Sequence, residues 1–189
     1  MDVLEAMRGR KSTRAYLDQP VMRATIESIL DAARWAPSGV NCQPWQVAVV
    51  MGTTKLRISE ALLDARKAGQ PENPDYAYYP KDWQEPYKSR RKATGLALYQ
   101  ALNIGKDDAF ARLKAWNGNY HFFGAPAGLL FFVDRALSQG AWVDMGMFVE
   151  NVMLAARAHG LETCPQASLA EYPDIVRGIL AIPATRALV

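Results

Sequence analysis

The sequence predicts an α+β sandwich, in which several helices cover one small central sheet. Two short runs, Gln46–Met51 and Ala127–Val133, are apolar and rich enough in β-branched or aromatic residues to form buried strands. Longer segments with apolar residues at helical spacing separate these strands. Few, widely separated strands among several helices favour a small sheet flanked by helices. At 189 residues and 50% hydrophobic content, the chain is expected to fold as one domain.

In the N-terminal part, Val3–Met7 predicts a short helix that ends near Gly9. Ala24–Trp35 predicts a second helix, which Pro37 stops. The strand Gln46–Met51 follows and is expected to be buried on both faces.

The third predicted helix runs to about Lys67, and Thr53 or Thr54 is expected to cap its start. Its apolar residues should face inward, namely Leu56, Ile58, Leu62 and Leu63. The second half of the chain predicts helices over Ser89–Leu102, Lys106–Trp116, Ser138 to a terminating Gly160, and Glu171–Leu180, and the start of a strand at Ala187–Val189.

Residues 69–86 break the periodic pattern with four prolines and several aromatic residues. Irregular stretches of this length in compact domains are usually functional or disordered, and the aromatic content argues against disorder. We therefore predict an inserted lid over about residues 69–118.

Composition excludes several classes of function. With 22 basic and 19 acidic residues, the charge is too balanced to indicate a nucleic-acid or membrane partner. Cys42 and Cys164 form no CxxC pattern, and His121 and His159 lack metal-ligand spacing, so we predict neither disulfides nor a metal site. No segment resembles an export signal or membrane span, which favours the cytoplasm.

A basic cluster near the N-terminus is the first candidate binding site. Arg10, Lys11 and Arg14 place three cations within five residues, with Ser12 between them. Arginine side chains match phosphate oxygens bidentately, and a hydroxyl completes such a site. A solvated basic surface is the alternative interpretation.

A second candidate is the loop within Trp35–Trp45, which reads WAPSGVNCQPW. Its prolines restrict the backbone, its glycine permits positive φ, and its amide side chains offer both donors and acceptors. The pattern suits a flat polar ligand. A simple turn explains the prolines and glycine but not the two amides. The residues concerned are Pro37, Ser38, Gly39, Asn41 and Gln43.

Taken together, these two motifs resemble those of the FMN-dependent nitroreductase family, which carries an RxSxR-like element followed by APSxxNxQPW. Segments within Pro86–Leu102 and Asn119–Pro126 are similar to a bacterial subgroup of that family. The resemblance implies a nitroreductase-like homodimer with FMN sites at the subunit interface. By this resemblance, Arg10, Lys11 and Ser12 bind the FMN phosphate end and Arg14 reaches the pyrimidine side of the ring.

The same resemblance assigns the loop at Pro37–Gln43 to the FMN bound by the other subunit. A third matching element, Pro165, Gln166, Ala167 and Ser168, is expected to lie against the flavin, with backbone groups near N5 and O4. Candidate substrate contacts are Tyr79, Trp83, Tyr87, Arg90 and Asn119. Dimer packing explains the aromatic residues equally well, and a turn-capping role also suits Asn119.

The resemblance implies an enzyme in which NAD(P)H reduces FMN and then leaves, and a nitroaromatic or quinone acceptor takes the electrons by ping-pong hydride transfer. No protein acid or nucleophile is required. Since no GxGxxG fingerprint is present, NAD(P)H would bind transiently over the flavin. The alternatives are a reductive dehalogenase, a flavin-cleaving enzyme, or a non-catalytic flavin-binding protein. Relatives continue beyond the position of Val189 with a core strand and a C-terminal arm, so we expect this chain to be truncated or compromised.

Overall fold

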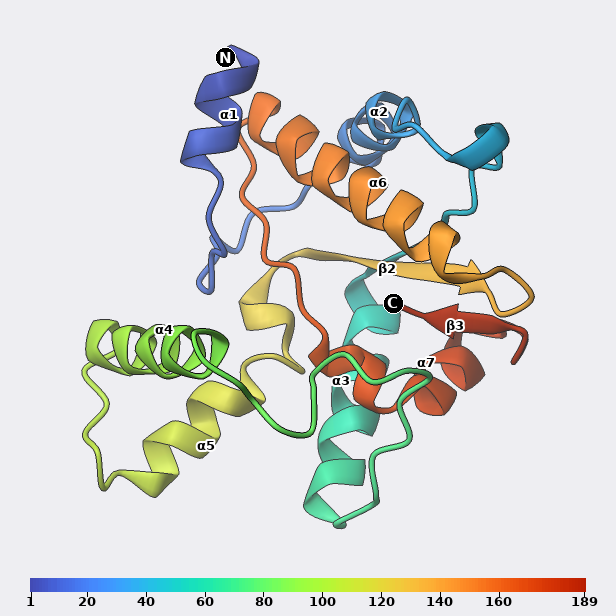
Figure 1. The fold of residues 1–189 in the computed structure, drawn as a ribbon. Coiled ribbons are helices and arrows are strands. Elements are labelled where there is room, and N and C mark those ends of the chain that lie inside the picture. The colour runs from blue at the N-terminus through green and yellow to red at the C-terminus, as the bar shows by residue number, and fades with distance from the viewer.

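The computed structural model describes all 189 residues and confirms the predicted α+β class. Seven α-helices surround one small sheet, and three short 3-10 helices occur in the connections (Figure 1). The α-helices are α1 (Val3–Gly9), α2 (Arg23–Ala33), α3 (Gly52–Lys67), α4 (Tyr87–Ala101), α5 (Ala109–Asn117), α6 (Gln139–Ala158) and α7 (Pro173–Leu180). The 3-10 helices are η1 (Gly39–Asn41), η2 (Phe122–Gly124) and η3 (Ser168–Glu171).

The sheet has three strands in the order β1-β2-β3, and both strand pairs are antiparallel. The strands are β1 (Gln46–Met51), β2 (Ala127–Asp134) and β3 (Arg186–Leu188). The register pairs Val49 with Leu129 and Val133 with Ala187. β3 pairs only with the last residues of β2, so the edge of β2 nearest Ala127 has no strand beside it on that side.

Helices cover both faces of the sheet, which gives the molecule its layers (Figure 1). α2 and α6 pack on one face, where Val133 and Phe148 belong to one apolar cluster. α3 and α7 pack on the other face, where Phe132 belongs to a second cluster. The long helix α6 turns one stripe toward the core because its buried residues recur every three or four positions. These are Ala141, Met145, Phe148, Val152 and Ala156.

Two helix ends differ from the prediction near prolines. α2 ends at Ala33, before the predicted Trp35, because a helical conformation is disfavoured for the residue that precedes Pro37. Trp35 is consequently 80% exposed. α7 begins at Pro173, since proline suits the first helical turn, and Glu171 belongs to η3 instead. The terminating glycine of α6 is confirmed, as Gly160 has a φ of +73°.

The prediction was also wrong about parts of α3 and β1. Neither Thr53 nor Thr54 caps α3, which starts at Gly52 without a side-chain capping bond. Leu56 is 52% exposed, because the helix buries only the face that carries Ile58 and Leu62. β1 is an edge strand whose faces are incompletely covered, and only Val50 in it is buried.

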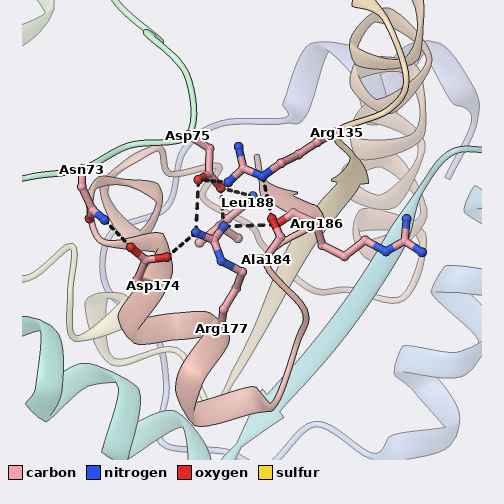
Figure 2. A network of polar contacts seen from close by, with 8 residues as sticks. All are labelled: Asn73, Asp75, Arg135, Asp174, Arg177, Ala184, Arg186 and Leu188. Carbon is pink, nitrogen blue, oxygen red and sulfur yellow. Dashed lines mark hydrogen bonds and ion pairs between the residues drawn. The ribbon is translucent and has the colours of Figure 1, made fainter.

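Residues 69–118 consist of an anchored first part and a projecting second part. The helices α4 and α5 contribute no buried residue and extend away from the sheet (Figure 1). The preceding stretch is held against η3, α7 and β3 (Figure 2). Its backbone is fixed where Asn73 N donates to Glu171 O over 2.9 Å.

Asp75 is the main anchor of this first part. Its side chain is 4% exposed and accepts hydrogen bonds from Arg177 Nη1 over 2.5 Å and Leu188 N over 2.8 Å (Figure 2). Arg135 also donates to it. Burial raises the pKa of Asp75, but these donors outweigh burial, and the net pKa is lowered.

None of the helices combines the length and apolar character that crossing a membrane requires.

Candidate functional site

The predicted basic cluster lies against the loop that follows α6. α1 ends at Gly9, so Arg10 and its neighbours continue as extended chain. Ser12 forms an isolated parallel bridge with Thr163, and Thr13 N donates to Thr163 O over 3.0 Å. The structure therefore brings two of the predicted cofactor-binding elements side by side, although more than 140 residues separate them in sequence.

The turn before β2 joins this pair. The Arg14 guanidinium lies 5.8 Å from the centroid of the Phe123 ring, at cation–π distance. Phe122 and Phe123 have φ values of 53° and 51°, a left-handed conformation that is costly for bulky residues. Such strain persists only where the surroundings enforce it, and it concentrates at functional sites.

Three side chains enforce this turn. Gln166 Nε2 donates to Asn119 O over 2.9 Å and to Asn119 Oδ1 over 3.2 Å. Lys55 of α3 donates to Ala125 O, and Ser59 Oγ lies 3.0 Å from His121 Nδ1. Asn119 also bonds Trp116 O within the turn over 2.8 Å, in keeping with a turn-stabilising role. The Gln166 side chain therefore connects the loop after α6 to the turn before β2.

The donor set of this region fits an anionic group such as a phosphate. Arg10, Lys11 and Arg14 take part in no ion pair within the chain, so no carboxylate competes for them. Close by, buried hydroxyls lack any hydrogen-bond partner, including those of Thr13, Thr163 and Ser168. Buried polar groups are normally paired, so unpaired ones at one place suggest a missing ligand.

Cys164 does not add a nucleophile to the site. Burial raises the pKa of its thiol, and the opposing charge of Arg14 only partly offsets this. The thiol is therefore protonated near neutral pH, whereas reactive cysteines have a lowered pKa.

A cavity of about 860 Å³ adjoins these loops. Thr13, Pro165, Gln166 and Ala167 line one part. Other parts are lined by the unpaired edge of β2, by apolar residues of α2 and α6, and by tyrosines of the lid. A mostly apolar lining with few polar groups suits a flat ring system. The three predicted phosphate-binding residues, Arg10, Lys11 and Ser12, lie outside its lining, as does Arg14, which was predicted to reach the ring. Within this motif, Thr13 is the residue that lines the cavity.

The Pro37–Gln43 loop stands apart from this region, beyond α2 and α6 (Figure 1). It is stabilised internally, since Gln43 N donates to Ser38 Oγ and Gln43 Nε2 donates to Asn41 Oδ1, both over 2.9 Å. Gly39 N donates to Asp144 of α6 over 3.2 Å. One copy of the chain therefore does not bring this loop to the other two predicted elements.

The predicted substrate residues are not gathered at one place: Tyr79 and Trp83 precede α4, Tyr87 and Arg90 lie in α4, and Asn119 lies in the turn before β2. Tyr79 lines the cavity, and its ring centroid lies 5.6 Å from that of Trp83. Tyr87 begins α4 and lies 5.9 Å from the Arg90 guanidinium. Asn119 faces Gln166 as described. Tyr79 is thus the member of this set that lines the cavity.

Sequence reasoning missed several residues that hold the site together. Asp75 and Arg177 anchor the lid, Phe123 contacts Arg14, and Asp144 holds the outlying loop. Asp144 carried a usable signal, because it is one of the few charged residues in a mostly apolar helix. The others lie in unremarkable positions whose partners are distant in sequence.

Fold and site together define an α+β protein with a basic cluster, free of ion pairs, near an apolar cavity. The chain belongs to the nitroreductase family: the family model described as "Nitroreductase family" matches residues 7–189.

Similar proteins include a 4-nitrobenzoate reductase from Nocardioides sp., which is 39% identical over 97% of this chain and 75% of its own length. Among solved structures, the FMN and NADPH-dependent nitroreductase NfnB from Sphigopyxis sp. strain HMH is 38% identical, with a TM-score of 0.97 over 100% of this chain and 85% of that one. NfnB from Mycobacterium smegmatis in complex with NADPH is 33% identical, with a TM-score of 0.92 over 98% and 82% of the two chains.

Proposed function

We propose that this chain is an FMN-dependent oxidoreductase that uses NAD(P)H to reduce nitroaromatic or quinone-type acceptors. The observation that carries the proposal is the meeting of the basic cluster with the Thr163–Ser168 loop, where the cations have no carboxylate partner. Membership of the nitroreductase family supports it, as do relatives named for FMN, NADPH and 4-nitrobenzoate. FMN would supply the electron-transfer chemistry, so the protein contributes position and electrostatics.

Each element has a distinct part in this proposal. Arg10, Lys11 and Ser12 bind the phosphate end through charge-assisted hydrogen bonds. Arg14, held over Phe123, would place positive charge beside the flavin ring and favour its reduction. The segment Pro165–Ser168 would face the ring with its backbone groups, because the Gln166 side chain is already bonded to Asn119.

A homodimer completes the site in this proposal, with FMN bound between the subunits. The Pro37–Gln43 loop of a second copy would supply amide groups that one copy cannot bring to its own basic cluster. Its exposure and its left-handed residues support a role in binding a partner. We place the enzyme in the cytoplasm, in keeping with two free cysteines and the need for NAD(P)H.

The first test is the visible spectrum of the purified, desalted protein, before and after anaerobic addition of NADPH. We expect a flavin spectrum that bleaches with NADPH and returns when a nitroaromatic or quinone is added. A protein that cannot be reconstituted with FMN, or bound FMN that NADPH does not reduce, would overturn the proposal.

A variant tests the phosphate site directly. We expect R10Q to weaken FMN binding roughly tenfold, the effect of losing one charge-assisted hydrogen bond of about 1.5 kcal/mol. Fluorescence titration with FMN measures it. R57Q is the matched control, because Arg57 is exposed on α3 and forms no ion pair.

A further inference from the structure

A continuous series of aromatic rings connects α6 with the start of α4. Successive ring centroids lie 4.5, 6.2, 4.7 and 5.6 Å apart, within the range of favourable aromatic contacts. We call this series the aromatic ladder. In order it consists of Trp142, Tyr76, Tyr78, Tyr79 and Trp83.

The aromatic ladder is fixed to the body of the protein at Tyr76, which we call its base. Tyr76 follows Asp75 directly, and the buried Asp75 carboxylate is bound by Arg177, Arg135 and Leu188 N (Figure 2). Burial raises the pKa of Tyr76 to about 12, so its hydroxyl is neutral at physiological pH. The base of the ladder is therefore fixed to the body of the protein, and the rings beyond it start from a defined position.

The far end of the ladder meets an unpaired cation. The Arg91 guanidinium lies 5.2 Å from the centroid of Trp83. Arg91 forms no ion pair within the chain, and the first turn of α4 contains no acidic residue.

The ladder also reaches the candidate site, since Tyr78 and Tyr79 line the cavity together with Pro165 and Gln166. Both tyrosines are 60% exposed, so their rings are accessible. Trp83 and Arg91 lie outside the cavity lining, and the ring planes of Tyr79 and Trp83 are tilted by 43°. A planar molecule stacked on Tyr79 in the cavity would therefore meet Trp83 at its edge and extend toward the Arg91 guanidinium. Stacking faces with a fork-shaped cation at one end are the groups that recognise an aromatic carboxylate.

We propose that Arg91 is a specificity-determining residue that selects aromatic acceptors carrying a carboxylate, while the acceptor ring stacks on Tyr79 and contacts the edge of Trp83. This inference rests on the proposed function, because it names the acceptor class of the same site. The rings contribute contact area for any nitroaromatic compound. The guanidinium contributes only where the acceptor carries a negative charge.

The test compares 4-nitrobenzoate with nitrobenzene, two acceptors that differ only in the carboxylate. We expect the FMN-loaded wild type to favour 4-nitrobenzoate in kcat/KM. R91Q should raise KM for 4-nitrobenzoate roughly tenfold, the usual effect of losing one charge-assisted pair, and change nitrobenzene less than about twofold. R91K should recover only part of the loss, because lysine lacks the planar fork. R57Q controls for the change in net charge.

Equal losses for both acceptors in R91Q would overturn the inference, because they would show that Arg91 only supports Trp83. Slower reduction of bound FMN by NADPH would also overturn it, since the cation would then bind the dinucleotide phosphate. If the wild type reduces both acceptors but does not prefer 4-nitrobenzoate, this inference is contradicted while the proposed function still stands.

Equilibrium binding of the two acceptors, followed by tryptophan fluorescence, provides a readout that does not depend on turnover. Tighter binding of 4-nitrobenzoate that is lost in R91Q supports the inference even if the proposed function fails. Equal binding of both compounds refutes it.

Discussion

The segment Gln70–Tyr79 and the loop Ser38–Gln43 both leave the core, and both are rich in turn-forming and polar residues, yet they are held in opposite ways. The first is fixed by a buried carboxylate, Asp75, whose hydrogen-bonding capacity is satisfied by two arginines and a backbone N–H (Figure 2). The second makes hydrogen bonds mainly within itself, and its link to the body of the protein is Gly39 N to Asp144.

The two segments also differ in backbone strain and exposure. Val40, Asn41 and Gln43 have φ values of 46°, 57° and 49°. For a β-branched residue such as Val40 this conformation costs about 1–2 kcal/mol, and the Val40 side chain is fully exposed, so its contacts within the chain do not offset that cost. Gln70–Tyr79 instead places its aromatic residues from a rigid base. We infer that the first segment positions substrate and the second meets a second subunit.

The largest expected effect comes from breaking the anchor of the first segment. D75N leaves the Arg177 guanidinium, which is 6% exposed, without its buried counter-charge. Removing one partner of a buried pair typically costs about 3–5 kcal/mol, and because Asp174 still contacts Arg177, we expect a value near 3 kcal/mol. Urea denaturation followed by circular dichroism measures the loss.

The matched control for D75N is D174N. Asp174 contacts the same arginine over 2.6 Å, but its side chain is 67% exposed. Solvent screens such pairs, so we expect a loss below about 1 kcal/mol. Equal losses in the two variants would show that burial of Asp75 does not add to stability. The contrast between the segment Gln70–Tyr79 and the loop Ser38–Gln43 would then fail.

The same anchor predicts a pH dependence of smaller size. The pKa of Asp75 is lower in the folded chain than in the unfolded chain, where it is about 3.9. Between these two values the unfolded chain binds more protons, so stability rises with pH. The contribution of Asp75 is complete above about pH 4 and is lost as pH falls through the folded pKa. Thermal melts at pH 2–6 should show a steeper acid loss for wild type than for D75N; parallel curves would contradict this.

Structural features set by neighbouring residues were predicted from the sequence better than features set by residues far apart in the chain. Strong local patterns predicted the strand Gln46–Met51 and the helix that ends at Gly160. Helix starts without side-chain caps, such as that of α3 at Gly52, carry little local signal and were misplaced. The inward-facing assignment of Leu56 failed because spacing identifies an apolar stripe but not the angle that its neighbours cover.

Long-range contacts were beyond the sequence pattern altogether. The motifs at Arg10–Arg14 and Pro165–Ser168 were recognised separately, but their pairing through Thr163 depends on how α6 crosses the sheet. Asp75 was not distinguished from other acidic residues, because its partner Arg177 is 102 positions away. A single sequence contains no signal for such a pair, since neither residue type at its own position is unusual.

The smallest expected effect comes from relieving the backbone strain in the loop Ser38–Gln43. V40G removes a β-branched side chain from a left-handed position, where glycine has no steric penalty. Relief of about 1–2 kcal/mol is partly cancelled by glycine's entropy cost of about 0.5–1 kcal/mol, so we expect a net gain of up to about 1 kcal/mol. V143G is the matched control, because Val143 is also exposed but lies inside α6, where glycine should cost a few tenths of a kcal/mol. Urea denaturation should therefore show changes in the free energy of unfolding of opposite sign for the two variants, at a protein concentration where the chain is monomeric.

Under conditions that favour self-association, sedimentation velocity should show weaker assembly of V40G, because the loop is then less well preorganised for its partner. Loss of stability in monomeric V40G would mean that Val40 makes stabilising contacts within its own chain, and the loop would then be scaffold like the first segment.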